Sequence, residues 1–186
     1  MIDVISTKIE DVKIIVPQVF ADDRGFFFES FNQKNFNDIL DVDINFVQDN
    51  HSKSSYGVLR GLHYQKNPFE QGKLVRVVSG KIWDVAVDIR IESPTYGQWI
   101  GEFLSSEDHK QLWIPRGFAH GFVVLSEYAE ICYKTDQFYK PDYELSIKYD
   151  DPDLNIGWPK IKTKPILSKK DSIGRSFKSL INDNSY

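Results

Sequence analysis

The sequence predicts an all-β fold, an antiparallel barrel or sandwich with only short peripheral helices. Apolar and polar residues alternate with a period of two through the middle of the chain. Turn residues separate short apolar segments at regular spacing, and helical spacing is confined to two short segments. Many short strands divided by turns are typical of barrels and sandwiches, in which antiparallel sheets close on themselves or pack in pairs.

The clearest strand is expected over residues 81–90. Two carboxylates on one of its faces, among small apolar residues, predict a barrel interior that is partly polar. In a regular strand, successive side chains point to opposite faces. One face then carries Trp83, Val85, Val87 and Ile89, and the other carries Ile82, Asp84, Ala86 and Asp88.

The remaining elements follow from the same patterns and from turn residues at 80–81, 93–97 and 115–117. Helical spacing of Phe36, Ile39 and Leu40 predicts a helix over residues 32–40. Ile173, Phe177, Leu180 and Ile181 predict a C-terminal helix that packs on the body of the protein. Further strands are expected at 12–16, 25–31, 58–65, 73–79, 98–104, 121–125 and 129–135.

Length and composition predict a single domain, residues 1–186, with a peripheral tail at about 172–186. The chain is 41% hydrophobic and 14% aromatic, which argues against disorder. With 23 Lys and Arg against 27 Asp and Glu, the net charge of −4 argues against a general binder of nucleic acids or anionic membranes. A local basic pocket for one phosphorylated ligand is compatible with that charge.

A single cysteine and the lack of a recognisable targeting or membrane-spanning segment predict a soluble cytoplasmic protein. Cys132 is the single cysteine, so neither an internal disulfide nor a cysteine-based zinc site can form. The first ten residues lack the basic and apolar regions of a signal peptide. No apolar segment approaches the roughly 18–20 residues needed to span a bilayer.

Two of the four histidines, His63 and His120, lie in segments rich in glycine and basic residues, whereas His51 and His109 lie in polar segments expected to be loops. Alternation over 58–65 places His63 and Arg60 on opposite faces. The glycines of this segment, however, favour bulges, which change the face to which the following side chains point. A cluster of basic, aromatic and imidazole side chains is more typical of a functional site than of a core.

Lys73 begins an expected strand that continues with apolar residues. At a sheet edge Lys73 would be solvated, whereas inside a barrel it would be a fixed cation for a phosphate or an oxyanion. Tyr133, Tyr139 and Tyr143 follow later in the chain. Most tyrosines of β domains pack in cores or at rims, so the residue type alone identifies no acid.

The segments around His63 and at 115–120 resemble the two half-motifs of the cupin barrel. Metal-binding cupins carry His-x-His and then Glu in the first half-motif and His in the second. Here the first reads His-Tyr-Gln, so Gln65 stands where the second histidine would be. Two histidines fall short of the usual three or four ligands, and we expect no metal.

Further motifs run in order through the chain, and together they resemble the dTDP-4-dehydrorhamnose 3,5-epimerase family of sugar-nucleotide epimerases. The resemblance extends from about residue 16 to residue 171. Its most distinctive part is Gly-Val-Leu-Arg-Gly-Leu-His-Tyr-Gln at 57–65, followed by Gln-Gly-Lys-Leu-Val at 71–75. Other parts are Asp-Arg-Gly-Phe at 23–26, Ile-Pro-Arg-Gly-Phe-Ala-His-Gly-Phe at 114–122 and Ser-Lys-Lys-Asp at 168–171.

The resemblance implies a homodimeric cupin-type jelly roll, without metal or cofactor, that converts dTDP-4-dehydro-6-deoxy-D-glucose to dTDP-4-dehydro-L-rhamnose. It implies that His63 is the base with Asp171 as its orienting partner, that Tyr133 is the acid, and that Lys73 steadies the enolate oxygen. The implied substrate-binding residues, some reaching across the dimer, are Arg24, Phe27, Glu29, Gln48, Asn50, Arg60, His120, Tyr139, Glu144 and Lys170.

The chemistry suits these residue types. The C4 ketone acidifies the protons on C3 and C5, so inversion needs a base on one face of the ring, an acid on the other and a cation at the oxygen. Histidine, with an unperturbed pKa of about 6.5, can accept a proton near neutral pH, and tyrosine, at about 10, keeps its own.

Three alternatives stay open. One is an epimerase that inverts C3 only or acts on another 4-keto nucleotide sugar, which deuterium incorporation from D₂O would distinguish. A second is a metal-dependent cupin enzyme using His63 and His120, which would lose activity with a chelator and regain it with Fe²⁺ or Mn²⁺. The third is a non-catalytic cupin that binds nucleotide sugars without exchange at C3 or C5.

Overall fold

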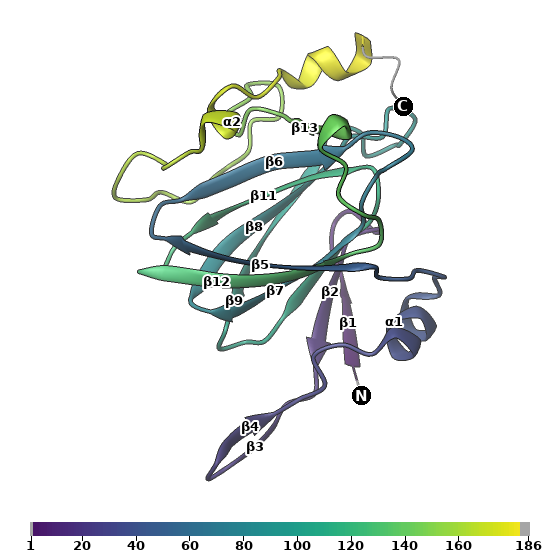
Figure 1. The fold of residues 1–186 in the computed structure, drawn as a ribbon, viewed down its shortest axis with the longest axis vertical. Coiled ribbons are helices and arrows are strands. Elements are labelled where there is room, and N and C mark those ends of the chain that lie inside the picture. Colours follow the sequence, from purple (N-terminus) through teal and green to yellow (C-terminus); the bar gives the residue numbers. More distant parts are fainter. Residues whose placement is uncertain (1, 183–186) are drawn as a thin grey trace.

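In the computed structural model, which describes residues 2–182, two antiparallel sheets face each other and enclose the centre of the protein (Figure 1). The predicted all-β antiparallel architecture is confirmed. One sheet has the order β1 (Ile2–Ser6), β2 (Lys13–Pro17), β10 (Gln111–Ile114), β7 (Lys73–Ser79), β12 (Tyr128–Thr135) and β5 (Gln48–Ser55). The other has the order β13 (Glu144–Ser146), β6 (Leu59–Gln65), β11 (Phe118–Val124), β8 (Lys81–Asp88) and β9 (Trp99–Ser105).

Short elements surround the sheets. A hairpin of β3 (Phe20–Asp22) and β4 (Gly25–Phe27) stands away from them (Figure 1). The strand predicted at 25–31 therefore ends earlier, because the chain turns toward α1 (Gln33–Leu40), whose N-cap Asn32 accepts a hydrogen bond from the Asn35 amide. The other short elements are the helix α2 (Lys169–Ser172) and the 3₁₀ helices η1 (Pro141–Tyr143) and η2 (Phe177–Asn182). No helix within residues 2–182 is long and apolar enough to cross a membrane.

Strand β8 shows why its two faces carry different residues. Ile82 and Ala86 belong to the core between the sheets. Trp83 and Val85 point to the outer side of the five-stranded sheet, where the C-terminal segment covers them. Both faces of the strand are buried, which agrees with a sequence that from Ile82 on is apolar on both faces apart from Asp84 and Asp88. A third cluster, around Phe36 and Trp113, packs α1 against the outside of the six-stranded sheet.

The C-terminal segment differs from the predicted helix. Phe177 and Leu180 are buried as expected, but Ile173 and Ile181 are 71% and 57% exposed. The amide of Arg175 donates to the carbonyl of Ser146, and this extended pairing interrupts a continuous helix before the short η2. Residues 183–186 of the predicted tail lie outside the described residues.

A β-bulge in β6 determines which side chains enter the interior. His63 pairs with His120 of β11 and Arg60 pairs with Phe122, so Gly61 and Leu62 together oppose Gly121. Leu62 points outward into the apolar cluster, while Arg60 and His63 both line the interior. The strict alternation that placed Arg60 and His63 on opposite faces was therefore wrong, and the bulge that the glycines favoured is its cause.

Gly61 meets the requirements of this bulge. Its φ is +122°, a backbone conformation that L-residues rarely adopt. A Cβ at this position would lie 2.5 Å from the Cα of Gly121. Two facing glycines thus let the strands approach closely at the bulge, next to His63.

Candidate active site

A cavity between the two sheets brings together most of the side chains singled out in the sequence. Its volume is about 350 Å³, which is enough for a small ligand. Its walls come from both sheets and from the loops beside them. The lining residues are Gln48, Asn50, Ser52, Arg60, His63, Gln71, Lys73, His120, Phe122, Tyr133, Tyr139 and Glu144.

His63 forms an imidazole–carboxylate pair with Asp171. The His63 Nε2 lies 2.5 Å from Asp171 Oδ1, and the Asp171 side chain is only 3% exposed. Burial by itself raises the pKa of Asp171, but hydrogen bonds from His63 and Ser168 outweigh it and lower this pKa to about 2. Asp171 is therefore a carboxylate at neutral pH, and it can only accept hydrogen bonds.

The start of α2 and the bulge of β6 hold Asp171 in place. Ser168 caps α2, accepting a hydrogen bond from the Asp171 amide at 3.1 Å, while its hydroxyl donates to Asp171 Oδ2 at 2.7 Å. The amide of Gly61, at the bulge, donates to Asp171 Oδ1 at 3.3 Å. Asp171 thus accepts hydrogen bonds on both oxygens, which fixes the orientation of the His63 ring.

Tyr133 reaches the same cavity from the opposite sheet. It lies on β12, whereas His63 lies on β6, so the two side chains belong to opposite walls. Burial raises the pKa of Tyr133, and Glu144 raises it further. The phenol therefore keeps its proton at neutral pH, and among the described residues its hydroxyl has no hydrogen-bond partner.

Lys73 is the cation inside the barrel. It is 8% exposed, so the interior alternative raised by the sequence holds and the solvated one does not. Burial lowers the pKa of Lys73 to about 8, partly opposed by Glu144 and Asp84. Its Nζ donates to the His63 carbonyl at 3.4 Å, which leaves the other two ammonium protons free to meet a ligand.

His120 forms a second imidazole–carboxylate pair, on the same wall as His63. Its Nε2 lies 2.5 Å from Oδ1 of Asp84, and both side chains are buried, at 9% and 0% exposure. Burial lowers the pKa of His120, while Asp84 opposes that shift. Asp84 is the carboxylate that the alternation of β8 placed in the interior, so the predicted polar interior is confirmed.

The mouth of the cavity is held by a chain of polar contacts. Tyr139 donates from its hydroxyl to Glu144 Oε2 at 2.6 Å, and Lys170 forms an ion pair with the same oxygen. The amide of Tyr139 donates to Gln48 Oε1 at 3.0 Å. Arg60 is hydrogen-bonded to the hydroxyl of Ser54, with its Nε at 3.1 Å. Cations, a carboxylate and an exposed aromatic ring are thus gathered at one opening.

Three predicted substrate-binding residues lie elsewhere within the chain. Arg24 and Phe27 belong to the hairpin of β3 and β4, and Glu29 follows it; none of these residues lines the cavity. The Arg24 side chain is 90% exposed and pairs with Asp22 at 2.6 Å. The Glu29 carboxylate accepts from the side-chain amides of Asn32 and Asn35, both at 3.1 Å, beside α1.

Gln65 has a structural role that differs from that of a metal ligand. Its Oε1 accepts from the Lys140 amide at 2.6 Å, and its Nε2 donates to the carbonyls of Phe69 and Phe138 at 2.5 and 3.2 Å. These three contacts direct the amide of Gln65 toward the loops around the cavity. Within residues 2–182, no group of three or more His, Cys, Asp or Glu side chains is arranged to hold a metal ion.

Sequence reasoning missed several members of the site. Asp84 was placed in the interior but was not assigned to His120, because nothing in the order of residues identifies their contact across two strands. The alternation along β5 could have indicated Ser52, which shares a face with Asn50. Gln71 and Phe122 also line the cavity, and both lie within motifs quoted above.

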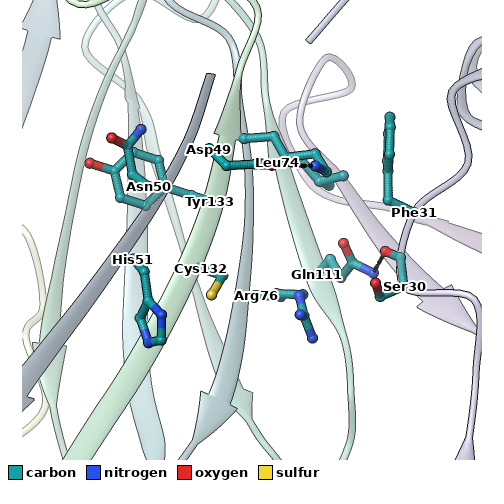
Figure 2. A pocket seen from close by; sticks show the side chains of 11 residues that line it. Ser30, Phe31, Asp49, Asn50, His51, Leu74, Arg76, Gln111, Cys132 and Tyr133 are labelled. Carbon is teal, nitrogen blue, oxygen red and sulfur yellow. Dashed lines mark hydrogen bonds and ion pairs between the residues drawn. The ribbon is translucent and has the colours of Figure 1, made fainter. Parts of the chain in front are cut away.

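A second pocket lies on the outer face of the six-stranded sheet (Figure 2). Arg76, Gln111 and Cys132 line it, and Asn50 and Tyr133 at its edge also border the cavity between the sheets. Its histidine, His51, pairs with Glu130 at 3.3 Å rather than with another lining residue. The paired acid–base groups described above therefore belong to the cavity between the sheets and not to this pocket.

Comparison with known proteins agrees with the geometry. The family model described as dTDP-4-dehydrorhamnose 3,5-epimerase matches residues 6–179. The dTDP-4-dehydrorhamnose 3,5-epimerase of Pseudomonas aeruginosa is 57% identical over 169 residues, covering 91% of this chain and 92% of that protein. The 3,5-epimerase structure from Legionella pneumophila, in complex with dTDP-4-keto-L-rhamnose, has a TM-score of 0.93 and 50% identity, covering 96% of this chain and 94% of that chain.

One further structure bears on which carbon atoms of the sugar ring are inverted. A 3′-monoepimerase from Streptomyces bikiniensis, in complex with dTDP-quinovose, has a TM-score of 0.89 and 32% identity, covering 95% of this chain and 89% of that one. The two relatives described above, at 57% and 50% identity, are thus 3,5-epimerases, and the monoepimerase is 32% identical. The predicted cupin-type jelly roll and the predicted isomerase class are confirmed. The chain belongs to the dTDP-4-dehydrorhamnose 3,5-epimerase family.

Proposed function

We propose that His63 removes the protons from C3 and C5 of dTDP-4-dehydro-6-deoxy-D-glucose as the general base. The supporting observation is its pairing with Asp171. Because Asp171 is ionised, the neutral imidazole donates from Nε2 and keeps a lone pair on Nδ1. The Asp171 carboxylate also stabilises the imidazolium that forms when this Nδ1 accepts a proton.

Tyr133 returns a proton from the other face of the sugar ring. Its place on the opposite sheet and its raised pKa support this role. Inversion requires that the proton arrive from the side opposite the base, and a phenol that stays protonated at neutral pH supplies it. After each turnover Tyr133 regains a proton and His63 loses one to solvent.

Lys73 stabilises the negative charge that develops on the C4 oxygen. An ammonium group held inside the barrel needs no reorganisation when the enolate forms, so its charge acts at full strength in the transition state. With Lys73 in this role the reaction requires neither a metal nor a redox cofactor, because the substrate already carries the ketone. His120, which is paired with Asp84, also lines the cavity and helps to bind the ligand.

The nucleotide diphosphate occupies the mouth of the cavity. Arg60, which lines the cavity, and Lys170, which pairs with Glu144 beside it, carry the charges that bind its phosphates. Gln48 and Asn50 supply amide groups to the ligand. Tyr139 and Glu144 enclose the sugar and the base. The dTDP sugar bound to the Legionella pneumophila relative supports this choice of ligand class.

A second copy of the chain completes the site. Phe20 and Phe27, which are register partners on one face of the hairpin, are 57% and 72% exposed. Two large aromatic rings on one protruding face are typical of a surface that another molecule covers. In a homodimer this hairpin brings Arg24 and Phe27 to the partner's cavity, with Glu29 beside them. Because the substrate is a charged sugar nucleotide, which does not cross membranes unaided, we place the reaction in the cytoplasm.

The observation that carries the proposal is the placement of His63–Asp171 and Tyr133 on opposite walls of a cavity that contains Lys73. The test is incubation with dTDP-4-dehydro-6-deoxy-D-glucose in D₂O, with a 4-keto reductase and NADPH to trap the product for ¹H NMR. Deuterium at both C3 and C5 supports the proposal. Deuterium at C3 alone assigns the chain to the monoepimerases, and no exchange overturns the catalytic roles.

A monoepimerase is the second candidate function, because a 3′-monoepimerase shares this fold. The two activities differ in whether the intermediate is protonated at C5 as well as C3. A His63→Ala variant, measured in parallel, controls for exchange caused by the buffer. Any deuterium incorporated by that variant is subtracted before C3 and C5 are compared.

A further inference from the structure

The hairpin of residues 20–28, here called the arm, has little to hold it in place. Its strands β3 and β4 pair with each other in a separate two-stranded sheet, and the arm projects from the barrel (Figure 1). An isolated two-stranded hairpin is marginally stable in water. An arm that is to reach another molecule with a defined orientation therefore needs a contact to the body of the protein.

His109 supplies such a contact. Its ring centroid lies 4.7 Å from that of Phe26 and 4.8 Å from that of Phe28, with interplanar angles of 49° and 40°. The two phenylalanine rings are 5.9 Å apart and nearly parallel, at 28°. One imidazole ring thus contacts both aromatic rings on one side of the arm, and neither the mechanism nor the substrate contacts make use of His109.

The loop that carries His109 is itself well ordered by hydrogen bonds. The hydroxyl of Ser105 accepts from the amides of Glu107 and Asp108, at 3.3 and 3.2 Å. Asp108 Oδ1 accepts from the Lys110 amide at 3.0 Å. His109 lies between these residues with φ +55°, a left-handed conformation that histidine, asparagine and aspartate adopt more readily than most residues.

The contact divides the arm into two faces. Phe26 and Phe28 are two residues apart and meet His109, so Phe27 between them points the other way. Phe27 shares that open face with Phe20, its register partner. The contact therefore leaves Phe27 72% exposed, and Phe26 beside the imidazole stays 62% exposed, so His109 contacts one face of the arm without burying it.

We propose that His109 is a positioning residue that holds the arm in the orientation in which it binds substrate at the partner's site. This inference rests on the proposed role of the arm in a homodimer. Without the His109 ring the arm samples more orientations, of which only a fraction are competent to bind. The apparent affinity falls by that fraction, while bound substrate still meets an unchanged set of catalytic groups. Loss of the His109 ring should therefore raise KM and leave kcat unchanged.

Two substitutions separate the ring from the backbone. His109→Asn keeps a residue that tolerates positive φ but removes the ring, and His109→Phe restores a ring in a residue that adopts this φ less readily. For His109→Asn we expect KM for the dTDP-sugar to rise about 10-fold with kcat within about twofold of the original, and for His109→Phe we expect KM to return most of the way. An unchanged KM in His109→Asn overturns the proposal, and recovery of KM in His109→Phe supports it.

Mixed dimers test whether the arm acts on the partner. Subunits with His109→Asn and an intact base are mixed with subunits that carry His63→Ala and a native arm. In the mixed dimer the one functional cavity receives the native arm, so its KM should equal that of the original protein. A KM that stays as high as in the His109→Asn homodimer overturns action in trans.

Arg24→Ala distinguishes failure of this inference from failure of the proposed function beneath it. The variant should raise KM because the guanidinium is lost from the arm. If Arg24→Ala leaves KM unchanged, the arm binds no substrate and the proposed function of the arm fails. If Arg24→Ala raises KM but His109→Asn does not, the arm functions and only the role of His109 is overturned.

Discussion

His63 and His120 stand opposite each other in the register of β6 and β11, and each ring places Nε2 2.5 Å from a carboxylate oxygen. The two pairs differ in access. The His63 side chain is 28% exposed, whereas that of His120 is 9% exposed. A base must exchange its proton with solvent after each turnover, so the more accessible pair is the one suited to proton transfer and the buried pair to holding a ligand.

Separate variants of the base and the acid should uncouple exchange from inversion. His63→Ala should abolish both deuterium exchange and turnover, because nothing else in the cavity takes its place. Tyr133→Phe should retain C–H exchange while net inversion falls by about 10²–10⁴, since deprotonation needs only the His63 side. Both are measured by ¹H NMR in D₂O. Near-normal turnover in both variants would contradict the assigned roles.

Asp171→Asn should lower kcat by about 10²–10⁴ while the protein stays folded. An amide can donate to His63 and so favour the wrong tautomer of the ring. Asp151→Asn is a matched control: Asp151 is also buried and accepts amide hydrogen bonds from Asp153 and Phe177, but it lies outside the cavity. That variant should lose stability and keep kcat, and an equal loss of kcat in both would argue for a general structural effect.

Lys73→Met should remove activity and yet stabilise the fold at neutral pH. Burial lowers the pKa of Lys73 from 10.5 to about 8. Below pH 8 Lys73 is charged in both the folded and the unfolded chain, so folding must bury that charge, which lowers the stability. Between pH 8 and 10.5 the unfolded chain binds more protons, so stability rises with pH across that range. Lys73→Met should add on the order of 2 kcal/mol to the free energy of unfolding at pH 7 and flatten that rise. Urea denaturation at several pH values measures both, and a less stable variant at pH 7 would refute the burial argument.

Activity should survive removal of divalent cations. Gln65 bonds to three loop groups, and the donor sets around His63 and His120 each contain a single carboxylate. Protein treated with EDTA and desalted should keep its full rate, and added Fe²⁺ or Mn²⁺ should not increase it. Loss of activity that returns with either cation would favour the metal-dependent alternative.

The sequence predicts the strands better than the ends of the chain. Alternation predicted which residues of β8 share a face, and the structure buries both faces, one between the sheets and the other under the C-terminal segment. The tail around Ile173 showed helical spacing, yet pairing of Arg175 with Ser146 made the backbone extended. That pairing joins residues far apart in sequence, which no local pattern reveals.

The site was predicted in part for the same reason. Motif residues such as His63, Lys73 and Tyr133 could be identified from their order, and the structure brings them to one cavity. The Asp84–His120 contact depends on the register of two strands, which spacing alone does not determine. Arg24 and Phe27 lie away from the cavity within one chain, so a single sequence cannot place them against a ligand.

The bulge at Gly61 means that the number of residues between Arg60 and His63, and not only their identity, encodes the site. A chain lacking Leu62 would keep every catalytic residue, and in a regular strand it would still point Arg60 and His63 to one face. It would, however, lose the bulge from which the Gly61 amide donates to Asp171. Insertions and deletions in this stretch should therefore disturb the support of the His63–Asp171 pair even where every catalytic residue is kept. Recombination between relatives is best directed to other segments.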